Sequence, residues 1–350
     1  MSTTTKAPRV IVVGAGIRGS MFARAVQQNP VAQLVAVCEP APAVRERVAG
    51  SLRVPGYADV QDALASHPEA TAAIIATPDF AHREAATACA AAGLDLLLEK
   101  PLATTSADAA AICDATERAG TRTYVGFENR WNDKFVEVHR QLASGRHGAM
   151  VAQIVNLNDT VFVPTEMLSW AAQSSPAWFL MPHSLDLAMW FSGARPVDVF
   201  ARGVRRVLPG LGVDTWDAVT ASFSMSDGSV LVLNSQWVLP TSAPSVFDFR
   251  YEAHTDAASY HIDIADTGVT RYGAERVDWL QFGVTESRGR LAGIPIAMVD
   301  DFLAAVSGAD VDLPDARHGQ VVTDAIEAVH QSLTSSTPVA VPTGRTSVSH

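Results

Sequence analysis

The chain has 350 residues, of which 48% are apolar and 18% charged, and this length favours two globular domains over one. Its formal net charge of −11 argues against a nucleic acid or an anionic membrane as a partner, because both bind basic surfaces. We expect a cytoplasmic protein, since no apolar run approaches the length of a membrane span and residues 1–7 lack the apolar core of a secretory signal.

Short apolar strands and helices alternate in the first third of the chain. Strands are expected at residues 9–13, 34–38, 73–76, 95–98 and 121–125, and helices at residues 18–28, 44–52, 81–92 and 107–119. Continuously apolar strands that alternate with helices indicate a parallel sheet covered on both faces. The sequence therefore predicts a doubly wound α/β domain, a Rossmann fold, over residues 1–127.

The residue composition and its pattern change near residue 148. Stretches rich in Val, Thr and aromatic residues, with partial alternation, occur at residues 150–163, 197–207, 218–223 and 229–239. Asp227-Gly228 is a hairpin signal between the last two stretches. Helices are expected at residues 182–191, 294–307 and 318–333. We expect residues 128–350 to form an α+β domain with a large, mostly antiparallel open sheet and helices on one face.

The three cysteines do not suggest a metal centre. Cys38, Cys89 and Cys113 are widely spaced in apolar or alanine-rich segments, unlike a disulfide framework or a zinc site. We expect buried free thiols in a reducing compartment and no metal.

A glycine-rich turn follows the first strand and reads Gly14-Ala15-Gly16-Ile17-Arg18-Gly19, a match to G-x-G-x-x-G. The first glycine permits the tight turn, the second lets the backbone approach a pyrophosphate, and the third lets the helix pack on the strand. Glu39 ends the second strand, where a carboxylate accepts the ribose hydroxyls and repels a 2′-phosphate. The sequence predicts a dinucleotide site that prefers NAD, and Arg45 leaves NADP open because a guanidinium accommodates that phosphate.

Two further segments follow strands of this sheet. Glu99-Lys100-Pro101 comes after the strand at residues 95–98, and the carboxyl ends of such strands face the cofactor crevice. Lys100 is therefore expected where a substrate meets the nicotinamide ring. Thr77 and Pro78 follow the neighbouring strand and are expected to line the same pocket, and His82 would begin the next helix.

In this order the motifs resemble the Gfo/Idh/MocA oxidoreductase family, which includes glucose–fructose oxidoreductase and inositol dehydrogenase. The resemblance covers roughly residues 9–193. It is carried by the glycine turn, Val37-Cys38-Glu39-Pro40, Ala76-Thr77-Pro78 with His82, Glu99-Lys100-Pro101-Leu102, Val125-Gly126-Phe127 with Arg130-Trp131, and His183-Ser184-Leu185-Asp186-Leu187 running to Trp190 and Gly193. The expected cofactor contacts therefore include Ile17, Arg18, Glu99, Lys100 and Arg130 in addition to Gly14, Gly16, Gly19, Glu39, Thr77, Pro78 and His82.

The resemblance also implies catalytic roles. Lys100 resembles the family's lysine that hydrogen-bonds the substrate oxygen, where an ammonium stabilises charge that grows during hydride transfer. Glu99 is expected to hold that side chain, and Pro101 to follow a cis peptide bond. His183 resembles the family's acid–base histidine, and Asp186 is expected to orient its ring or to bind a substrate hydroxyl.

The residues around His183 give a separate argument. Pro182 suits the first position of a helix, which would place His183 in the first turn. A helix N-terminus disfavours imidazolium and leaves a neutral imidazole able to take a hydroxyl proton. Asp186, three residues later, would share a helix face with His183.

One position departs from the family pattern. Sugar and cyclitol members often carry Asp four residues before the histidine, and this chain has Phe179 there. Aromatic side chains gather nearby in the sequence at Phe162, Trp170, Trp178 and Phe179, with Trp237 further on. Such rings either stack on the apolar face of a sugar or an aglycone, or belong to the core or a subunit interface. Trp170, Trp178, Phe179 and Trp237 are the candidate substrate contacts.

The sequence thus indicates an NAD(P)-dependent oxidoreductase that interconverts a secondary alcohol and a ketone on a sugar or glycoside. The alternatives are a reductase of a nucleotide-linked ketosugar, a trans-dihydrodiol dehydrogenase, and a dinucleotide-binding regulator without catalysis. We expect a homodimer or homotetramer that pairs through the sheet of the second domain, because an open sheet with an apolar face must be covered.

Overall fold

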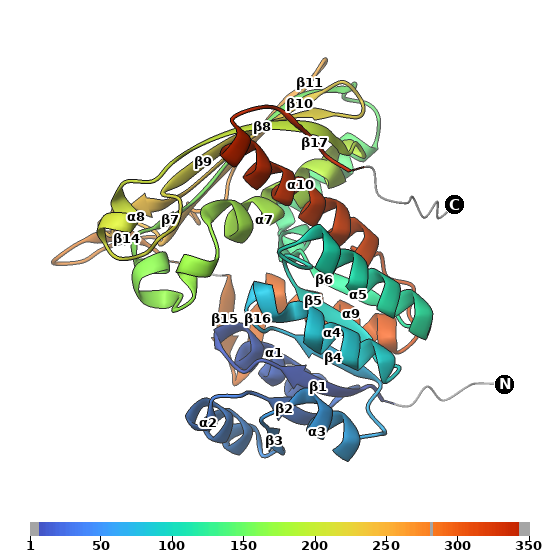
Figure 1. Cartoon of the computed structure of the whole chain (residues 1–350). Coiled ribbons are helices and arrows are strands. Elements are labelled where there is room, and N and C mark those ends of the chain that lie inside the picture. Colours follow the sequence, from blue (N-terminus) through green and yellow to red (C-terminus); the bar gives the residue numbers. More distant parts are fainter. Residues whose placement is uncertain (1–6, 281–282, 343–350) are drawn as a thin grey trace. The chain divides into compact units, whose positions relative to one another are not determined.

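The computed structural model describes residues 7–280 and 283–342, which form two compact units (Figure 1). The first unit contains the described residues up to 128 together with residues 283–320. The second contains the described residues from 129 to 282 and those after 320. The single boundary expected after residue 127 does not account for residues 283–320, which pack with the first unit.

A six-stranded parallel sheet, in the order β3-β2-β1-β4-β5-β6, is the centre of the first unit. Its strands are β1 (Arg9–Val13), β2 (Gln33–Cys38), β3 (Gly56–Tyr57), β4 (Ala72–Ile75), β5 (Asp95–Glu99) and β6 (Thr123–Gly126). The central strands are buried on both faces, as in the run from Val10 to Val13. This confirms the predicted doubly wound sheet. The strand order reverses at β1, so the glycine turn lies at the topological switch point.

Helices connect these strands: α1 (Ile17–Gln28), α2 (Pro42–Leu52), α3 (Val60–Ser66), α4 (His82–Ala91) and α5 (Ser106–Ala119). Their ends follow from local sequence. The Thr105 hydroxyl accepts a 3.0 Å hydrogen bond from the Asp108 N–H at the start of α5, and Gly120 ends that helix with a φ of 67°. Helix α3 is not among the expected helices, because seven residues are too few to show a clear helical period.

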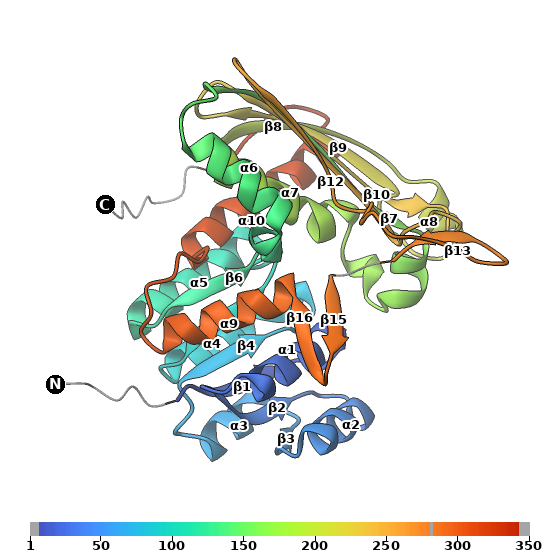
Figure 2. The same ribbon diagram turned by 180° about the vertical axis from the view of Figure 1, so that it is seen from behind.

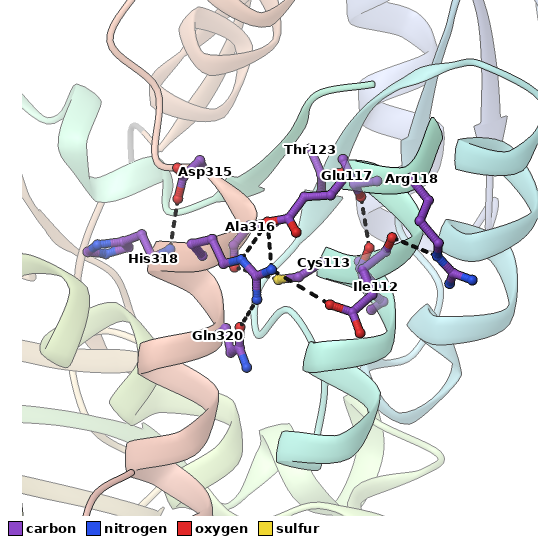
Figure 3. Close-up of polar contacts among 12 residues, drawn as sticks. Ile112, Cys113, Glu117, Arg118, Thr123, Asp315, Ala316, His318 and Gln320 are labelled. Carbon is purple, nitrogen blue, oxygen red and sulfur yellow. Dashed lines mark hydrogen bonds and ion pairs between the residues drawn. The ribbon is translucent and has the colours of Figure 1, made fainter. Parts of the chain in front are cut away.

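Residues 283–320 complete the first unit. β15 (Val284–Ser287) and β16 (Arg290–Gly293) form a hairpin near α1, and α9 (Ile294–Val306) packs on α1 and β5. The start of α10 (Ala316–Ser335) is fixed to α5, as Figure 3 shows. There the Cys113 thiol donates to the Ala316 carbonyl at 3.4 Å, and Arg317 pairs with Glu117 at 2.6 Å. These contacts join positions 203 and 200 residues apart, which local sequence patterns do not reveal.

The second unit is built on a seven-stranded sheet in the order β12-β11-β7-β10-β9-β8-β17. Its strands are β7 (Met150–Thr160), β8 (Pro196–Val204), β9 (Ala218–Met225), β10 (Val230–Leu239), β11 (Phe247–Thr255), β12 (Ser259–Asp263) and β17 (Val339–Ala340). Neighbours are antiparallel except β7 and β10, which confirms the predicted mostly antiparallel sheet. The expected hairpin at Asp227-Gly228 joins β9 to β10, where Gly228 has a φ of 86°.

Helix α7 (Pro176–Ser192) packs on β7, β9 and β10, and α6 (Asp133–Ala143) packs on α7 (Figure 2). Smaller elements of this unit are α8 (Val207–Gly210) and the two-stranded ribbon of β13 (Thr270–Tyr272) and β14 (Val277–Trp279). In the described ranges, we find no helix with the length and apolarity needed to span a bilayer.

Helix α7 starts earlier than the sequence predicts. Ser175 is the N-cap, with its hydroxyl accepting from the Trp178 N–H at 3.1 Å, and Pro176 occupies the first position. Pro182 lies inside the helix and His183 near its middle, so the prediction that His183 lies in the first turn is wrong. Extensive burial of α7 offsets the hydrogen bond that Pro182 cannot donate. His183 is therefore too far from the N-terminus of α7 for that end of the helix to keep its ring neutral.

Candidate functional site

The glycine turn of the first unit has the shape that a pyrophosphate requires. Gly14 has a φ of 87°, and a Cβ there would lie 2.6 Å from the Ala76 carbonyl oxygen. A Cβ at Gly19 would lie 1.8 Å from the Gly14 carbonyl oxygen, which explains the close packing of α1. A Cβ at Gly16 would meet no atom within 4 Å, and Ile17 beside it is 73% exposed. The turn is therefore open where a dinucleotide would approach the N-terminus of α1, and these residues fit that cofactor.

Glu39 is held in place at the end of β2. One carboxylate oxygen accepts from the Ala15 N–H at 2.9 Å and the other from the Ala41 N–H at 3.0 Å. Arg45 donates instead to two backbone carbonyls, of Glu39 at 2.7 Å and of Pro40 at 3.0 Å. The acid thus lies against the glycine turn, and the guanidinium supports the loop after β2. This arrangement fits ribose hydroxyls better than a 2′-phosphate.

Lys100 follows β5 and is bordered by a network of charges. The peptide bond to Pro101 is cis, as expected. Glu99 accepts a 2.7 Å hydrogen bond from Arg18 Nε, and the same guanidinium also pairs with Glu128. Burial alone would lower the pKa of Arg18, but the charges of Glu128 and Glu99 outweigh it and raise that pKa. Burial lowers the pKa of Lys100, against the opposing attraction of Glu99.

His82 begins α4, and its ring contacts both the loop after β4 and the loop after β5. It is 1% exposed, with Nδ1 2.9 Å from the Pro101 carbonyl oxygen and Nε2 3.1 Å from that of Thr77. Burial lowers the pKa of His82, although the charge of Asp79 opposes this. The Thr77 hydroxyl is buried and has no hydrogen-bond partner in the described part of the chain. His82 supports the loop that holds Lys100, and Pro78 lies half-buried between Thr77 and Asp79.

In the second unit, α7 leaves only a narrow stripe partly exposed. Four of its residues are not buried, Phe179, His183, Trp190 and Ser192. The spacings of four and seven place the first three on one face of the helix. His183 is therefore the ionisable group on the accessible face of a helix that is otherwise part of the core.

Two neighbouring residues of the short helix η2 (Glu128–Trp131) contact this face of α7. The Asn129 amide nitrogen lies 3.1 Å from His183 Nδ1, and Asn129 is 8% exposed. Arg130 donates to Asp186 through Nε at 3.1 Å to both oxygens and through Nη2 at 2.7 Å. The Arg130 guanidinium also lies 5.5 Å from the Trp190 ring. Asn129 was missed in the sequence, where its only signal was its place beside Arg130.

The structure groups three of the four candidate aromatic contacts. The Phe179 ring lies 6.1 Å from Trp170 and 5.6 Å from Trp237. Trp237 is fully buried, whereas Phe179 and Trp170 are partly exposed and Phe162 is 39% exposed. Trp178 lies apart from this cluster, stacked on His330 with ring centroids 5.3 Å apart. Phe179, the member of this cluster on α7, lies one helical turn before His183.

Comparisons with known proteins identify the family. The sequence profile described as "Oxidoreductase family, NAD-binding Rossmann fold" matches residues 8–127, and that of the "GFO/IDH/MocA C-terminal domain" matches residues 135–261. The inositol 2-dehydrogenase of Rhizobium meliloti is 25% identical over 69% of this chain and 72% of that protein. The myo-inositol dehydrogenase of Streptomyces leeuwenhoekii is 28% identical over 76% of this chain and 79% of that protein.

Solved structures share the fold. The apo scyllo-inositol dehydrogenase from Lactobacillus casei superimposes with a TM-score of 0.82 at 19% identity, over 97% of this chain and 99% of that chain. The two profiles confirm the resemblance found in the sequence and the expected dinucleotide cofactor. The chain is therefore an NAD-binding oxidoreductase of the Gfo/Idh/MocA family.

Proposed function

We propose that the protein is an NAD-dependent dehydrogenase that interconverts a secondary alcohol and a ketone on a sugar-like ring. The proposal depends on one observation. The chain combines a partly exposed lysine of lowered pKa after β5 with a partly exposed histidine on the buried helix α7. Two relatives named as inositol dehydrogenases support oxidation of a CH–OH group.

Lys100 is assigned the substrate oxygen. An ammonium stabilises negative charge that develops on that oxygen, and burial lowers the pKa of Lys100, which makes its ammonium a readier proton donor. His183 is assigned the hydroxyl proton, with Asn129 at its other side. Bound NAD supplies the acceptor for the hydride. The glycine turn, with Gly14 and Gly16, would hold its pyrophosphate, and Glu39 its ribose.

The substrate is assigned an apolar part. Phe179 stands where sugar and cyclitol relatives often have a carboxylate, and it forms one cluster with Trp170 and Trp237. The Phe179 ring offers no hydrogen-bond partner to a substrate hydroxyl where a carboxylate would, but it stacks well on the apolar face of a pyranose or on an aglycone. A glycoside therefore fits this chain better than a small, fully polar cyclitol.

A substrate screen tests the proposal. Sugars, glycosides and cyclitols are each mixed with the enzyme and NAD, then with NADP, and the absorbance of the reduced nicotinamide is followed. We expect turnover on glycosides with NAD. In Lys100→Met and in His183→Ala, we expect the turnover rate to fall roughly tenfold or more. Unchanged turnover in both variants would reject the assigned roles. Dinucleotide binding without turnover on any substrate would favour a regulator.

We also propose a homodimer or homotetramer that pairs through the seven-stranded sheet. Helix α7 packs on one face, and the other face carries the partly exposed apolar residues Ile154, Phe200 and Val232 in register with the exposed Ser222 of β9. Size-exclusion chromatography with light scattering tests this assembly, and a monomer at micromolar concentration would reject it.

A further inference from the structure

We propose that Arg18 is a positioning residue for Lys100, because its guanidinium holds two carboxylates that lie beside the lysine. The inference rests on the proposed function, in which Lys100 binds the substrate oxygen. Arg18 is the second residue of α1 and belongs to the glycine turn. Its guanidinium nevertheless contacts Glu99 at the end of β5 and Glu128 shortly after β6.

The contacts of Arg18 lead to the backbone of Lys100. Arg18 Nε donates to one carboxylate oxygen of Glu99 at 2.7 Å, and Nη2 pairs with Glu128. The other oxygen of Glu99 accepts from the backbone N–H of Lys100 at 3.2 Å. A chain of hydrogen bonds therefore connects the first turn of α1, where a pyrophosphate would bind, to the lysine assigned to the substrate oxygen.

The guanidinium is well held in this position. The Glu99 side chain is 9% exposed, so its charge needs a partner, and Arg18 supplies a charge-assisted hydrogen bond. The guanidinium carbon also lies 4.8 Å from the ring centroid of Phe22, a fully buried residue one turn later on α1. A guanidinium presents its donors in a fixed plane, which suits it to hold two carboxylates in one geometry better than the rotatable ammonium of a lysine.

Arg18 also sets the balance of charge at Lys100. The charged groups that influence the pKa of Lys100 come from different elements around it: Glu99 of β5, Asp79 of η1 (Asp79–Ala81), Glu128 of η2 and Arg18 of α1. The carboxylates raise this pKa, whereas Arg18 lowers it in the same direction as burial. His82 of α4 contacts the loop after β5 but adds no positive charge at neutral pH, since burial lowers its pKa. Arg18 therefore limits how strongly the carboxylates hold the proton of Lys100.

Removing the cation and removing a carboxylate should have opposite consequences. Arg18→Met keeps an apolar stem over Phe22 but leaves Glu99 and Glu128 to attract the Lys100 ammonium, so the pKa of Lys100 should rise. Glu128→Gln keeps the shape of the side chain and leaves more of the positive charge of Arg18 acting on Lys100, so that pKa should fall. A residue that only filled space would not produce this reversal of sign.

Carbon NMR of the lysine side chains tests the inference without substrate or cofactor. The chain has three lysines, Lys6, Lys100 and Lys134, so full-length protein labelled at lysine Cε gives few signals, and Lys100→Met identifies the one that matters. We expect the titration midpoint of Lys100 to rise by about one pH unit in Arg18→Met and to fall by roughly half a unit in Glu128→Gln.

A matched control comes from the same helix. Arg24 of α1 forms an exposed pair with Glu286, and Arg24→Met should leave the Lys100 midpoint unchanged. A midpoint that is the same in the wild type, Arg18→Met and Glu128→Gln would overturn the inference, as would shifts of equal sign in the two variants. If Arg18→Met does not fold, the sign of the shift in Glu128→Gln decides.

Binding and kinetics separate this role from that of a phosphate ligand. Because its guanidinium is committed to carboxylates, Arg18→Met should bind NAD with a Kd within about threefold of the wild type in calorimetric titration. With a glycoside found in the substrate screen and saturating NAD, its kcat should fall about tenfold. A Kd about tenfold higher with an unchanged Lys100 midpoint would make Arg18 a phosphate contact and reject the inference. If Lys100→Met were fully active, the proposed function would fail, but the NMR midpoints would still decide the role of Arg18.

Discussion

Arg130 donates to both carboxylate oxygens of Asp186, and the two side chains are only 12% and 1% exposed. This pair connects η2 to the middle of α7, one turn beyond His183. It gives Asp186 a structural partner in addition to the catalytic role that family resemblance implies. Measurements of stability and of activity separate the two roles.

The first prediction concerns this ion pair. Removing one partner leaves the other charge buried, so Asp186→Ala and Arg130→Met should each lower the free energy of unfolding by roughly 3–5 kcal/mol. The double variant should lose less than the sum, because no unpaired charge remains. Equilibrium urea unfolding of the four proteins measures this. Additive losses would mean that the two groups do not depend on each other.

The second prediction is a pH dependence of stability. Burial lowers the pKa of His330 to about 4, and its Nε2 lies 3.1 Å from the hydroxyl oxygen of Ser175, the residue that caps α7. Below its ordinary pKa the unfolded chain takes up a proton that the folded chain excludes. As the pH falls from about 6.5 to about 4, this group should lower the free energy of unfolding by roughly 3 kcal/mol. Above about pH 6.5 that stability is fully present.

Two variants check the assignment to His330. His330→Phe keeps a ring against Trp178 and removes the titration, so its unfolding free energy should vary less over this window. His261→Phe, at an exposed position of β12, is the control and should follow the wild type. The same acid loss in all three proteins would show that another group is responsible.

The third prediction separates two glycines of one turn. Gly14→Ala puts a side chain at a φ of 87° against the Ala76 carbonyl, and should lower stability by about 1–3 kcal/mol. Gly16→Ala meets no atom within 4 Å, so it should fold with an unchanged Tm. It should nevertheless weaken NAD binding about tenfold, because the methyl group occupies the approach of the pyrophosphate. Thermal denaturation and calorimetric titration with NAD check both, and a wild-type Kd in Gly16→Ala would contradict the placement of the cofactor.

The fourth prediction concerns the choice between NAD and NADP. Glu39→Ala removes the carboxylate that accepts from Ala15 and Ala41, and should raise the KM for NAD about tenfold while reducing discrimination against NADP. Glu46→Ala, at an exposed position of α2, is the matched control and should change neither constant. Steady-state kinetics with both cofactors measure the ratio. A ratio that stays constant in Glu39→Ala would assign the selectivity to other residues.

The fifth prediction addresses the aromatic cluster. Phe179→Ala should lower kcat/KM for glycosides with an apolar aglycone by about tenfold, and that for a small polyol much less. Phe162→Ala, outside the contacts of this cluster, offers a comparison at an exposed aromatic position. Equal losses on both substrate types in Phe179→Ala would assign this ring to the core rather than to substrate recognition.

The sequence predicted well those features that depend on residues close together in the chain. The glycine turn, Glu39 at the end of β2 and the cis peptide before Pro101 each occupy a short segment with its own backbone requirement. The alternation of strands and helices likewise identified the Rossmann sheet, because continuously apolar strands are stable only when both faces are covered. Lys100 was found in the same way, as the residue that follows one of these strands.

Helix α7 shows where local signals conflict. Pro182 suits the first position of a helix, and the sequence predicts a start there; Pro176 suits that position equally well. The structure begins the helix at Pro176, because the Ser175 hydroxyl caps it and because burial of nearly the whole helix stabilises an internal proline. Burial is a property of the folded chain, so the segment alone could not decide between the two prolines.

The sequence by itself determined the family, the dinucleotide turn and the identity of Lys100 and His183 as candidates, since each depends on adjacent residues. Only the tertiary structure decided which side chains contact His183 and Asp186. Asn129 with His183 and Arg130 with Asp186 join positions 54 and 56 residues apart, and residues 283–320 return to the first unit. Such contacts depend on how buried surfaces fit together, and a one-dimensional pattern of residue types does not record that fit.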